Sequence, residues 1–188
     1  MEKKIIAIVG MPGAGKSLCV EFLTEHKIPS IYFGGITIDE IKSRGLDVTE
    51  ANEKMIREEI RKKEGKAAYA KRMITKINAL FEAGNDIVVA DGLYSWTEYK
   101  LFKQHFDKNA LIIAIIAFRK LRHERLSKRP FRPLTEEEVT SREYAEIENL
   151  EKGGPIANAD YTILNNSTPK ELLKQLKLIL SEEHIDIT

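Results

Sequence analysis

The stretch Gly10-Met11-Pro12-Gly13-Ala14-Gly15-Lys16-Ser17 follows an apolar run, Ile5 to Val9, and fits the pattern G-x-x-x-x-G-K-[ST] at every fixed position. Glycine permits the backbone angles that turn N–H groups inward around phosphate oxygens. The lysine of this pattern reaches the β and γ phosphates, and the hydroxyl ligates Mg²⁺. We therefore predict a loop that binds ATP or GTP, followed by a helix whose positive end faces the same anion. The alternative is a glycine-rich turn with a solvated lysine.

The charge balance of the chain excludes some classes of partner. The 188 residues include 30 Lys and Arg against 29 Asp and Glu, a net charge of +1. Coating nucleic acid or an anionic membrane requires a large basic excess, so we expect neither as a main role. The longest apolar run, Ala110 to Phe118, is shorter than the ~20 residues that cross a bilayer. With no secretory signal at the N-terminus, we expect one compact cytoplasmic domain with Cys19 in its core.

Apolar stretches of strand length alternate along the chain with helical segments, which predicts a parallel sheet covered on both faces. The predicted strands are 4–9, 30–33, 86–90, 111–118 and 161–164. The predicted helices are 17–26, 49–64, 66–83, 95–105, 120–128, 135–151 and one with Thr168 as N-cap. Capping boxes begin the last two of these helices. We predict a three-layer α/β fold of the P-loop NTPase type with a five-stranded sheet and its ligand at the carboxyl ends of the strands.

A second acidic position lies where the third predicted strand ends, in Ile87-Val88-Val89-Ala90-Asp91-Gly92. Mg²⁺ prefers oxygen ligands, and a charge on an apolar strand is costly without a partner. We predict that Asp91 contacts the metal together with Ser17, or contacts the acceptor. Its alternative role is the N-cap of the next helix.

Basic residues accumulate between Arg119 and Arg132. Guanidinium groups match the oxygens of a phosphoryl group during transfer. Arg125 and Arg129 are four residues apart, which predicts one helical face, and Arg142 lies on the helix that follows. Pro130 and Pro133 predict a loop, so we interpret the segment as a hinged lid carrying arginines. The alternative for any single arginine is a solvated helix end.

With these residues identified, the chain resembles the nucleoside-monophosphate kinase group of P-loop proteins, and most closely the dephospho-coenzyme A kinases and archaeal proteins similar to CMP and AMP kinases. The phosphate loop is the specific motif, and the others contribute through their order along nearly the whole chain. These are Arg44-Gly45-Leu46 with Thr49, Glu50 and Asn52, Gly65 before Ala70-Lys71-Arg72, Asp91-Gly92, Arg125 to Arg129, Arg142-Glu143, and Ala159 to Asn165.

The resemblance implies a single kinase-like domain with three parts: a core (1–35, 84–122 and 150–188), a helical acceptor-binding insert (36–83) with three helical stretches, and a lid (123–149). It implies that Lys16 and Ser17 hold phosphate and metal, that Leu18 and Asn165 belong to the nucleotide site, and that residues up to Thr168 lie beside the base. It also implies that the transferred group is contacted by Arg125, Arg129 and Arg142.

The sequence departs from that family after the second predicted strand. Relatives carry an acid preceded by Gly there, often with an Arg three residues later, whereas this chain has Gly35 and Ile38. Asp39 comes four residues late, and Arg44 or Arg72 would have to replace the missing cation. The acceptor, and the residue that activates its hydroxyl, therefore stay open.

We predict Mg²⁺-dependent phosphoryl transfer from ATP to a small nucleotide or nucleotide-like acceptor, with Lys16, Asp91 and the three arginines as catalytic residues. One alternative is dephospho-coenzyme A kinase itself. Another is a regulatory ATPase without an acceptor. Nucleic-acid binding through residues 119–132 is less favoured, and ATP or GTP preference and oligomeric state are left open. Tyr94, Trp96 and Tyr99 line the acceptor pocket or form a packed aromatic cluster.

Overall fold

The computed structural model describes residues 3–93, 95–130 and 133–187. Its sheet has five parallel strands in the order β2-β3-β1-β4-β5. The strands are β1 (Lys4–Val9), β2 (Ser30–Tyr32), β3 (Ile87–Asp91), β4 (Ala110–Ile116) and β5 (Tyr161–Leu164). The predicted five-stranded parallel α/β fold is confirmed, and β1 and β5 have the predicted bounds.

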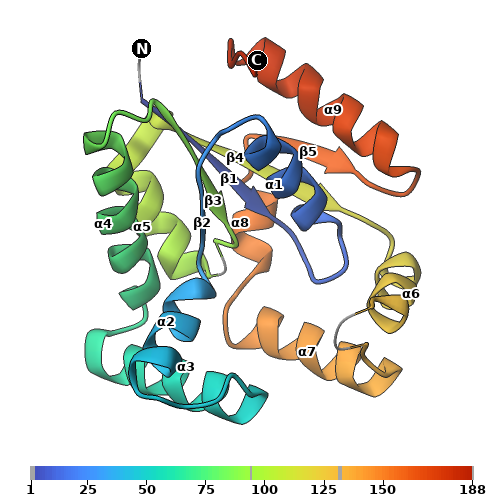
Figure 1. Cartoon of the computed structure of the whole chain (residues 1–188). Coiled ribbons are helices and arrows are strands. Elements are labelled where there is room, and N and C mark those ends of the chain that lie inside the picture. The colour runs from blue at the N-terminus through green and yellow to red at the C-terminus, as the bar shows by residue number, and fades with distance from the viewer. Residues whose placement is uncertain (1–2, 94, 131–132, 188) are drawn as a thin grey trace.

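Helices follow each strand and cover the sheet (Figure 1). They are α1 (Lys16–Glu25), α2 (Gly35–Ser43), α3 (Glu50–Glu64), α4 (Ala68–Glu82), α5 (Trp96–Phe106), α6 (Arg119–Lys128), α7 (Glu136–Glu148), α8 (Gly153–Ala157) and α9 (Pro169–Glu182), with a short 3-10 turn at Asp107–Asn109. Side-chain caps begin several of these helices, and Ser95, Thr135 and Thr168 each accept the N–H three residues on. These caps satisfy N–H groups that the first turn leaves without partners, which fixes where the helices begin.

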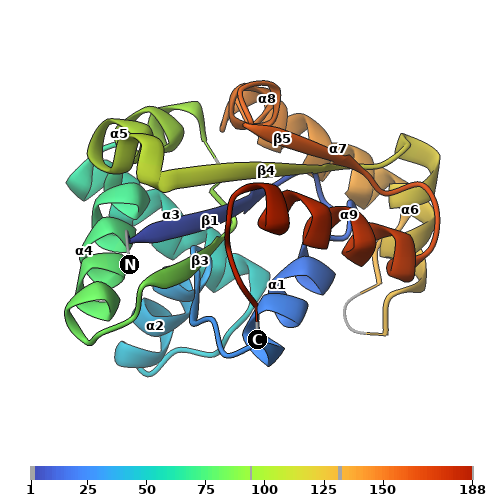
Figure 2. The same ribbon diagram turned by 90° about the horizontal axis from the view of Figure 1, so that it is seen from above.

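The sheet has helices on both faces, as Figures 1 and 2 show. An apolar cluster of buried side chains lies between the helices and the sheet on each face. Met73 and Ile77 of α4 and Phe102 of α5 are fully buried in one cluster. Cys19 of α1 and Leu176 of α9 are fully buried in the other. Burial raises the pKa of the Cys19 thiol to about 12, so Cys19 is a core residue as predicted. Each large apolar side chain buried in these clusters contributes roughly 1.5–3 kcal/mol.

Some predicted bounds were wrong for local reasons. The fourth strand ends at Ile116 rather than 118, because the Phe118 N–H is donated to the Asn166 side chain at 2.8 Å and Phe118 caps α6. Helix α7 ends at Glu148 rather than 151, since Glu151 has a left-handed φ of 52°. The short α8 was not predicted.

The segments predicted as insert and lid have clear positions. Residues 36–83 contain nearly all of α2 together with α3 and α4, and residues 123–149 contain the end of α6 and α7. In Figure 1, α2, α3 and α7 lie beyond the carboxyl ends of the strands, on the side of the loop that follows β1. Helix α4 packs on the sheet, whereas acceptor binding by this segment stays a prediction. Within the described ranges, no helix has the length and apolar content to cross a membrane.

Candidate functional site

The predicted phosphate loop lies between β1 and α1, and its glycines have the backbone that the motif requires. Gly13 and Gly15 have φ angles of 76° and 104°, in the left-handed region that favours glycine. A Cβ atom at Gly15 would lie 2.3 Å from Nδ2 of Asn165, so this position has no room for a side chain. The loop ends where α1 begins at Lys16, so the positive end of this helix faces the loop.

The Lys16 side chain folds back over this loop. Its Nζ donates to the carbonyl oxygen of Gly10 at 2.9 Å and to that of Met11 at 3.3 Å. Burial, with the nearby positive charge of Lys152, lowers the pKa of Lys16 to about 7, although Glu146 and Asp91 oppose the shift. A polyphosphate bound beside Lys16 would favour its charged ammonium form and would raise this pKa again. Leu18, two residues on, packs against the apolar cluster under α1.

Asp91 ends β3 beside the first strand, where it pairs in register with Ile8. Burial raises the pKa of Asp91, and the charges of Lys16 and Lys152 act in the opposite direction. Ser95, not Asp91, caps α5, so the N-cap alternative was wrong. The hydroxyl of Ser17 and the carboxylate of Asp91 are oxygen donors of the kind Mg²⁺ takes, with phosphates and water completing its shell. Among the described residues, no group of three His, Cys, Asp or Glu side chains is placed to hold a metal by itself.

Two arginines of α6 donate hydrogen bonds to backbone carbonyl oxygens of the phosphate loop. Arg125 donates to the carbonyl oxygen of Gly13 at 3.4 Å and to that of Asn165 at 3.0 Å. Arg122 donates to the carbonyl oxygen of Pro12 at 3.3 Å. Asn165 completes this arrangement, because its Nδ2 donates to the Ala14 carbonyl oxygen at 2.8 Å. These arginines therefore contact the loop itself and are not a solvated helix end.

The predicted alignment of Arg125 and Arg129 on one helical face was wrong. Helix α6 ends at Lys128, and Arg129 has an extended backbone with φ −64° and ψ 143°. The Pro130 that follows disfavours a helical conformation at Arg129, which explains the helix end. Arg132 and Phe131 of the predicted basic lid lie outside the described residues.

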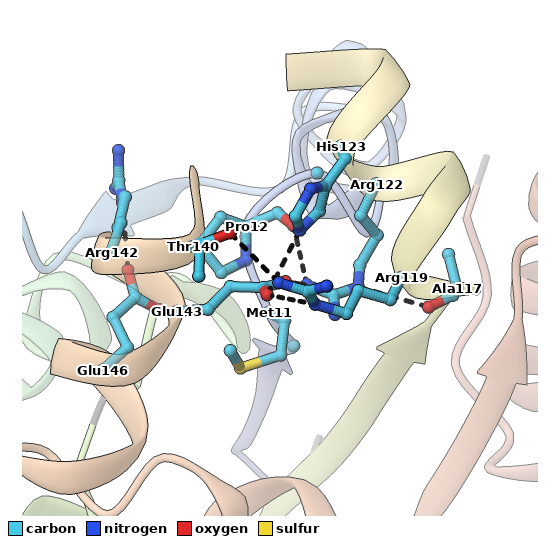
Figure 3. Close-up of polar contacts among 12 residues, drawn as sticks. Met11, Pro12, Ala117, Arg119, Arg122, His123, Thr140, Arg142, Glu143 and Glu146 are labelled. Carbon is cyan, nitrogen blue, oxygen red and sulfur yellow. Dashed lines mark hydrogen bonds and ion pairs between the residues drawn. The ribbon is translucent and has the colours of Figure 1, made fainter. Parts of the chain in front are cut away.

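A buried carboxylate on α7 gathers three basic side chains of α6, as Figure 3 shows. Glu143 is 3% exposed. Its Oε1 lies 2.5 Å from Arg122, and its Oε2 accepts from Arg119 at 2.8 Å and lies 3.2 Å from His123. Burial would raise the pKa of Glu143, but the hydrogen bonds from Arg119 and His123 hold it below its usual value. Since Arg122 also bonds to the loop, Glu143 links α7 to the phosphate loop.

A second buried pair was not predicted from the sequence. Lys152, just before α8, is 2% exposed, and its Nζ donates to a carboxylate oxygen of Glu146 on α7. The Nε of Arg142 donates to the other oxygen of Glu146 at 3.2 Å. The sequence gives little signal for this group, because Glu151-Lys152 before two glycines is typical of a solvated loop.

Other candidates lie in carboxylate-rich surroundings away from the loop. Arg44 bonds to Glu40 and Glu59, and Arg72 bonds to Glu64. Asp39 is 65% exposed in its side chain and pairs with Lys76 at 2.9 Å. None of these three predicted acceptor groups contacts the phosphate loop in the structure.

The aromatic residues after Asp91 pack against the body of the protein. The rings of Trp96 and Tyr99 stack at 5.1 Å, and the Tyr99 hydroxyl donates to the carbonyl oxygen of Asn158 at 3.0 Å. This agrees with the packed-cluster alternative. Tyr94 lies outside the described residues.

Fold and loop together define a P-loop protein with a kinase-like fold, which implies nucleotide binding. A family model described as "AAA domain" matches residues 6–149. A shikimate kinase from Acinetobacter baumannii is 20% identical with a TM-score of 0.56, covering 96% of this chain and 94% of the other. A gluconokinase from Sinorhizobium meliloti is 12% identical with a TM-score of 0.62, covering 95% and 92%. At these identities the likeness shows the fold alone.

Proteins with similar sequences show which family of P-loop proteins this chain belongs to. The UPF0200 protein TK1334 of Thermococcus kodakarensis is 34% identical over 181 residues, which are 95% of this chain and 97% of that protein. The chain belongs to the UPF0200 family. The P-loop part of the predicted resemblance is thereby confirmed, whereas likeness to dephospho-coenzyme A kinases in particular stays a prediction.

Proposed function

We propose that this protein transfers a phosphoryl group from Mg-ATP to a small nucleotide or nucleotide-like acceptor. The observation that carries the proposal is the convergence of Lys16 on a complete phosphate loop with Asp91 at the end of the adjacent strand. Phosphoryl transfer needs positioning and charge neutralisation more than covalent help from the protein. The half-buried ammonium of Lys16, the oxygen pair of Ser17 and Asp91 and nearby guanidinium groups would supply these.

Each predicted site residue has a role in this scheme. The loop amides and Lys16 hold the β and γ phosphates, while Ser17 and Asp91 hold Mg²⁺, which neutralises charge on the transferred group when bound. Arg142 and Arg129 contact the γ-phosphoryl. Arg125 and Asn165 keep the loop in its binding conformation through the carbonyl contacts described above, with Leu18 supporting the loop from below.

The acceptor would enter from the side of α2, α3 and α4. Gly34 precedes α2 and Gly35 begins it. The carboxylate that nucleoside-monophosphate kinases carry after the second strand is therefore missing from that position. The exposed, paired Asp39 is a poor replacement, which favours Asp91 as the group nearest the attacking hydroxyl. On this side the hydroxyls of Thr37 and Tyr69 lie 2.7 Å apart and buried. The guanidinium of Arg61 lies over the Tyr69 ring at 4.9 Å.

The test is a screen for acceptor-stimulated ADP release with Mg-ATP. The acceptors should include nucleoside monophosphates, dephospho-coenzyme A, and the hydroxy acids shikimate and gluconate, which the names of the structural neighbours suggest. We expect ADP release to rise by orders of magnitude with one class, and Lys16→Met to abolish the rise. Transfer by Lys16→Met at the parental rate would contradict the assignment.

A regulatory ATPase is the second candidate, favoured by the missing carboxylate after β2. It predicts tight ATP binding and slow hydrolysis that no acceptor of the screen stimulates. Saturable ATP binding, together with ADP release that no acceptor in the screen increases, would support the regulatory ATPase over the kinase.

A further inference from the structure

One arginine of the helical insert (36–83) differs from the others in its partners. Arg44, Arg57 and Arg72 each donate hydrogen bonds to carboxylates of the same segment. Arg61 of α3 pairs instead with Glu98 of α5, whose Oε1 lies 3.9 Å from Nη2, beyond hydrogen-bond distance. Among the described residues, no group accepts a hydrogen bond from the Arg61 guanidinium.

This guanidinium is nevertheless held in place. The Arg61 side chain is 27% exposed, and its guanidinium carbon lies 4.9 Å from the centre of the Tyr69 ring. A cation is attracted to the face of an aromatic ring. Tyr69 is itself buried, and its hydroxyl lies 2.7 Å from that of Thr37 at the start of α2. Arg61 is therefore oriented by its surroundings, while its N–H donors stay available to water or to a ligand.

Contacts through Glu98 connect Arg61 to the carboxyl end of β3. The second carboxylate oxygen of Glu98, Oε2, accepts the N–H of Ser95 at 3.0 Å. Ser95 is the N-cap of α5 and follows Asp91 by four residues. The buried Glu98 side chain thus ties the guanidinium to the segment that leaves β3 directly after Asp91.

Contacts through α2 lead to the same place. Tyr69, under the guanidinium, meets Thr37 of α2, and the Phe33 N–H just before α2 donates to the Asp91 carbonyl oxygen at 2.9 Å. Asp91 pairs in register with Ile8, two residues before the phosphate loop. In Figure 1, α2 and α3 lie beyond the carboxyl ends of the strands, on the side of that loop. Two separate sets of contacts therefore place Arg61 on the acceptor side of the candidate site.

The geometry of Arg61 suits a ligand better than a structural ion pair. Arg72 approaches Glu64 to 3.0 Å and forms hydrogen bonds with it. Arg61 stays 3.9 Å from Glu98, which supplies counter-charge without using the N–H donors. The planar fork of a guanidinium matches the oxygens of carboxylate and phosphate groups, and hydrogen bonds between such charged partners are strong. An oxyanion is thus the ligand chemistry that fits this position.

We propose that Arg61 binds an oxyanion of the acceptor, a phosphate or a carboxylate group, so that the acceptors of this protein are anionic. This inference rests on the proposed function, in which the acceptor enters from the side of α2, α3 and α4. It assigns to Arg61 the part for which the sequence offers Arg44 or Arg72, whose guanidinium groups are bonded to carboxylates. It predicts that Arg61 discriminates between compounds that differ only in that anionic group.

The experiment compares pairs of compounds by calorimetry, with the phosphate loop occupied by saturating Mg-ADP so that the compounds cannot bind there. The pairs are AMP with adenosine, CMP with cytidine, and shikimate with its methyl ester. We expect the parental protein to bind the charged member of one pair at least about tenfold more tightly, as for a charge-assisted hydrogen bond. A preference in a nucleotide pair identifies a phosphate, and a preference for shikimate identifies a carboxylate.

The variants assign this preference to Arg61. Arg61→Met should abolish it and leave the affinities for the neutral member and for Mg-ADP unchanged. Arg61→Lys keeps the charge without the planar fork and should recover part of it. Lys103→Met is the matched control, because the Lys103 side chain is 28% exposed and donates to the Ala110 carbonyl oxygen at the opposite end of the sheet. This variant should keep the parental preference.

The outcomes separate the inference from its premise. Equal parental affinity for both members of every pair would overturn the inference, and so would a preference that Arg61→Met keeps. If thermal unfolding shows that Arg61→Met does not fold, Arg61→Gln must give the same selective loss. A preference that depends on Arg61, without ADP release from Mg-ATP, would refute the proposed function and leave the oxyanion site standing. A parental protein that binds no Mg-ADP would refute both.

Discussion

The lowered pKa of Lys16 gives the phosphate loop a measurable dependence on pH. Burial, followed by the charge of Lys152, brings this pKa to about 7 in the nucleotide-free protein. A polyphosphate beside Lys16 favours the charged ammonium and raises its pKa again. Above pH 7 the neutral amine must therefore take up a proton when nucleotide binds, and affinity must fall as pH rises.

The magnitude follows from the pKa. At pH 8 only about one tenth of the free protein carries a charged Lys16, so binding should take up about 0.9 proton. At pH 6 about nine tenths are already charged, and uptake should fall to about 0.1. Above pH 7 the affinity for Mg-ADP should decrease by up to about tenfold per pH unit.

Calorimetry in two buffers with different ionisation enthalpies measures the proton uptake directly. Lys16→Arg is the control, because arginine stays charged and should abolish the uptake at pH 8. Lys152→Met removes the neighbouring cation, which raises the pKa of Lys16 and should reduce the uptake. Equal uptake at pH 6 and pH 8, or full uptake by Lys16→Arg, would refute the reasoning.

Three further outcomes follow from particular contacts. Gly15→Ala should lose about 1–3 kcal/mol of unfolding free energy and most nucleotide binding, because φ is 104° at this position and the new Cβ would lie 2.3 Å from Asn165. Denaturant unfolding and calorimetry measure the two losses, and parental values in both would contradict the prediction. Glu143→Gln should cost about 2–3 kcal/mol in denaturant unfolding, since the buried guanidinium of Arg122 loses its counter-charge, and a loss under 0.5 kcal/mol would exclude that role. Cys19, whose pKa is raised by burial to about 12, should react with a thiol reagent only on unfolding, so rapid labelling of native protein would disprove its burial.

Much of the fold could be predicted because its signals are local. Buried parallel strands are apolar on both faces, so 4–9 and 161–164 could be delimited from composition alone. Helix starts carried capping residues, and the structure has both bonds of the predicted capping box at Thr135. At Thr168 it has the bond from the Glu171 N–H to the Thr168 side chain. Helix α8 was not predicted because Gly153, Gly154 and Pro155 are poor helix formers. In the structure the helix packs against Trp96 at Gly154, a contact that the local sequence does not indicate.

The site could be predicted only where its chemistry lies within one short motif. The loop from Gly10 to Ser17 is such a motif, and Asp91 is marked by an apolar strand. Lys152 and its partner Glu146 have no such mark, and Glu143 was singled out only within the pair Arg142-Glu143. Their burial depends on α7 packing back against α6 and the loop, and residues in a charged helix look solvated until that contact forms. Long-range contacts of this kind leave no periodic pattern in a single sequence.

A net charge of +1 conceals how unevenly this chain distributes its charge. On the outer helices, basic residues meet carboxylates in exposed pairs such as Lys128 with Glu124 at 2.7 Å, which contribute little. At the carboxyl ends of the strands, the two lysines Lys16 and Lys152 lie near only a few carboxylates, and burial lowers the pKa of Lys16. A polyanion bound there would give Lys16 an anionic partner beside the carbonyl oxygens of Gly10 and Met11, so nucleotide should stabilise the fold as well as occupy the site. Proton uptake at Lys16 and stabilisation of the fold by nucleotide are therefore two measurements of the same electrostatic interaction.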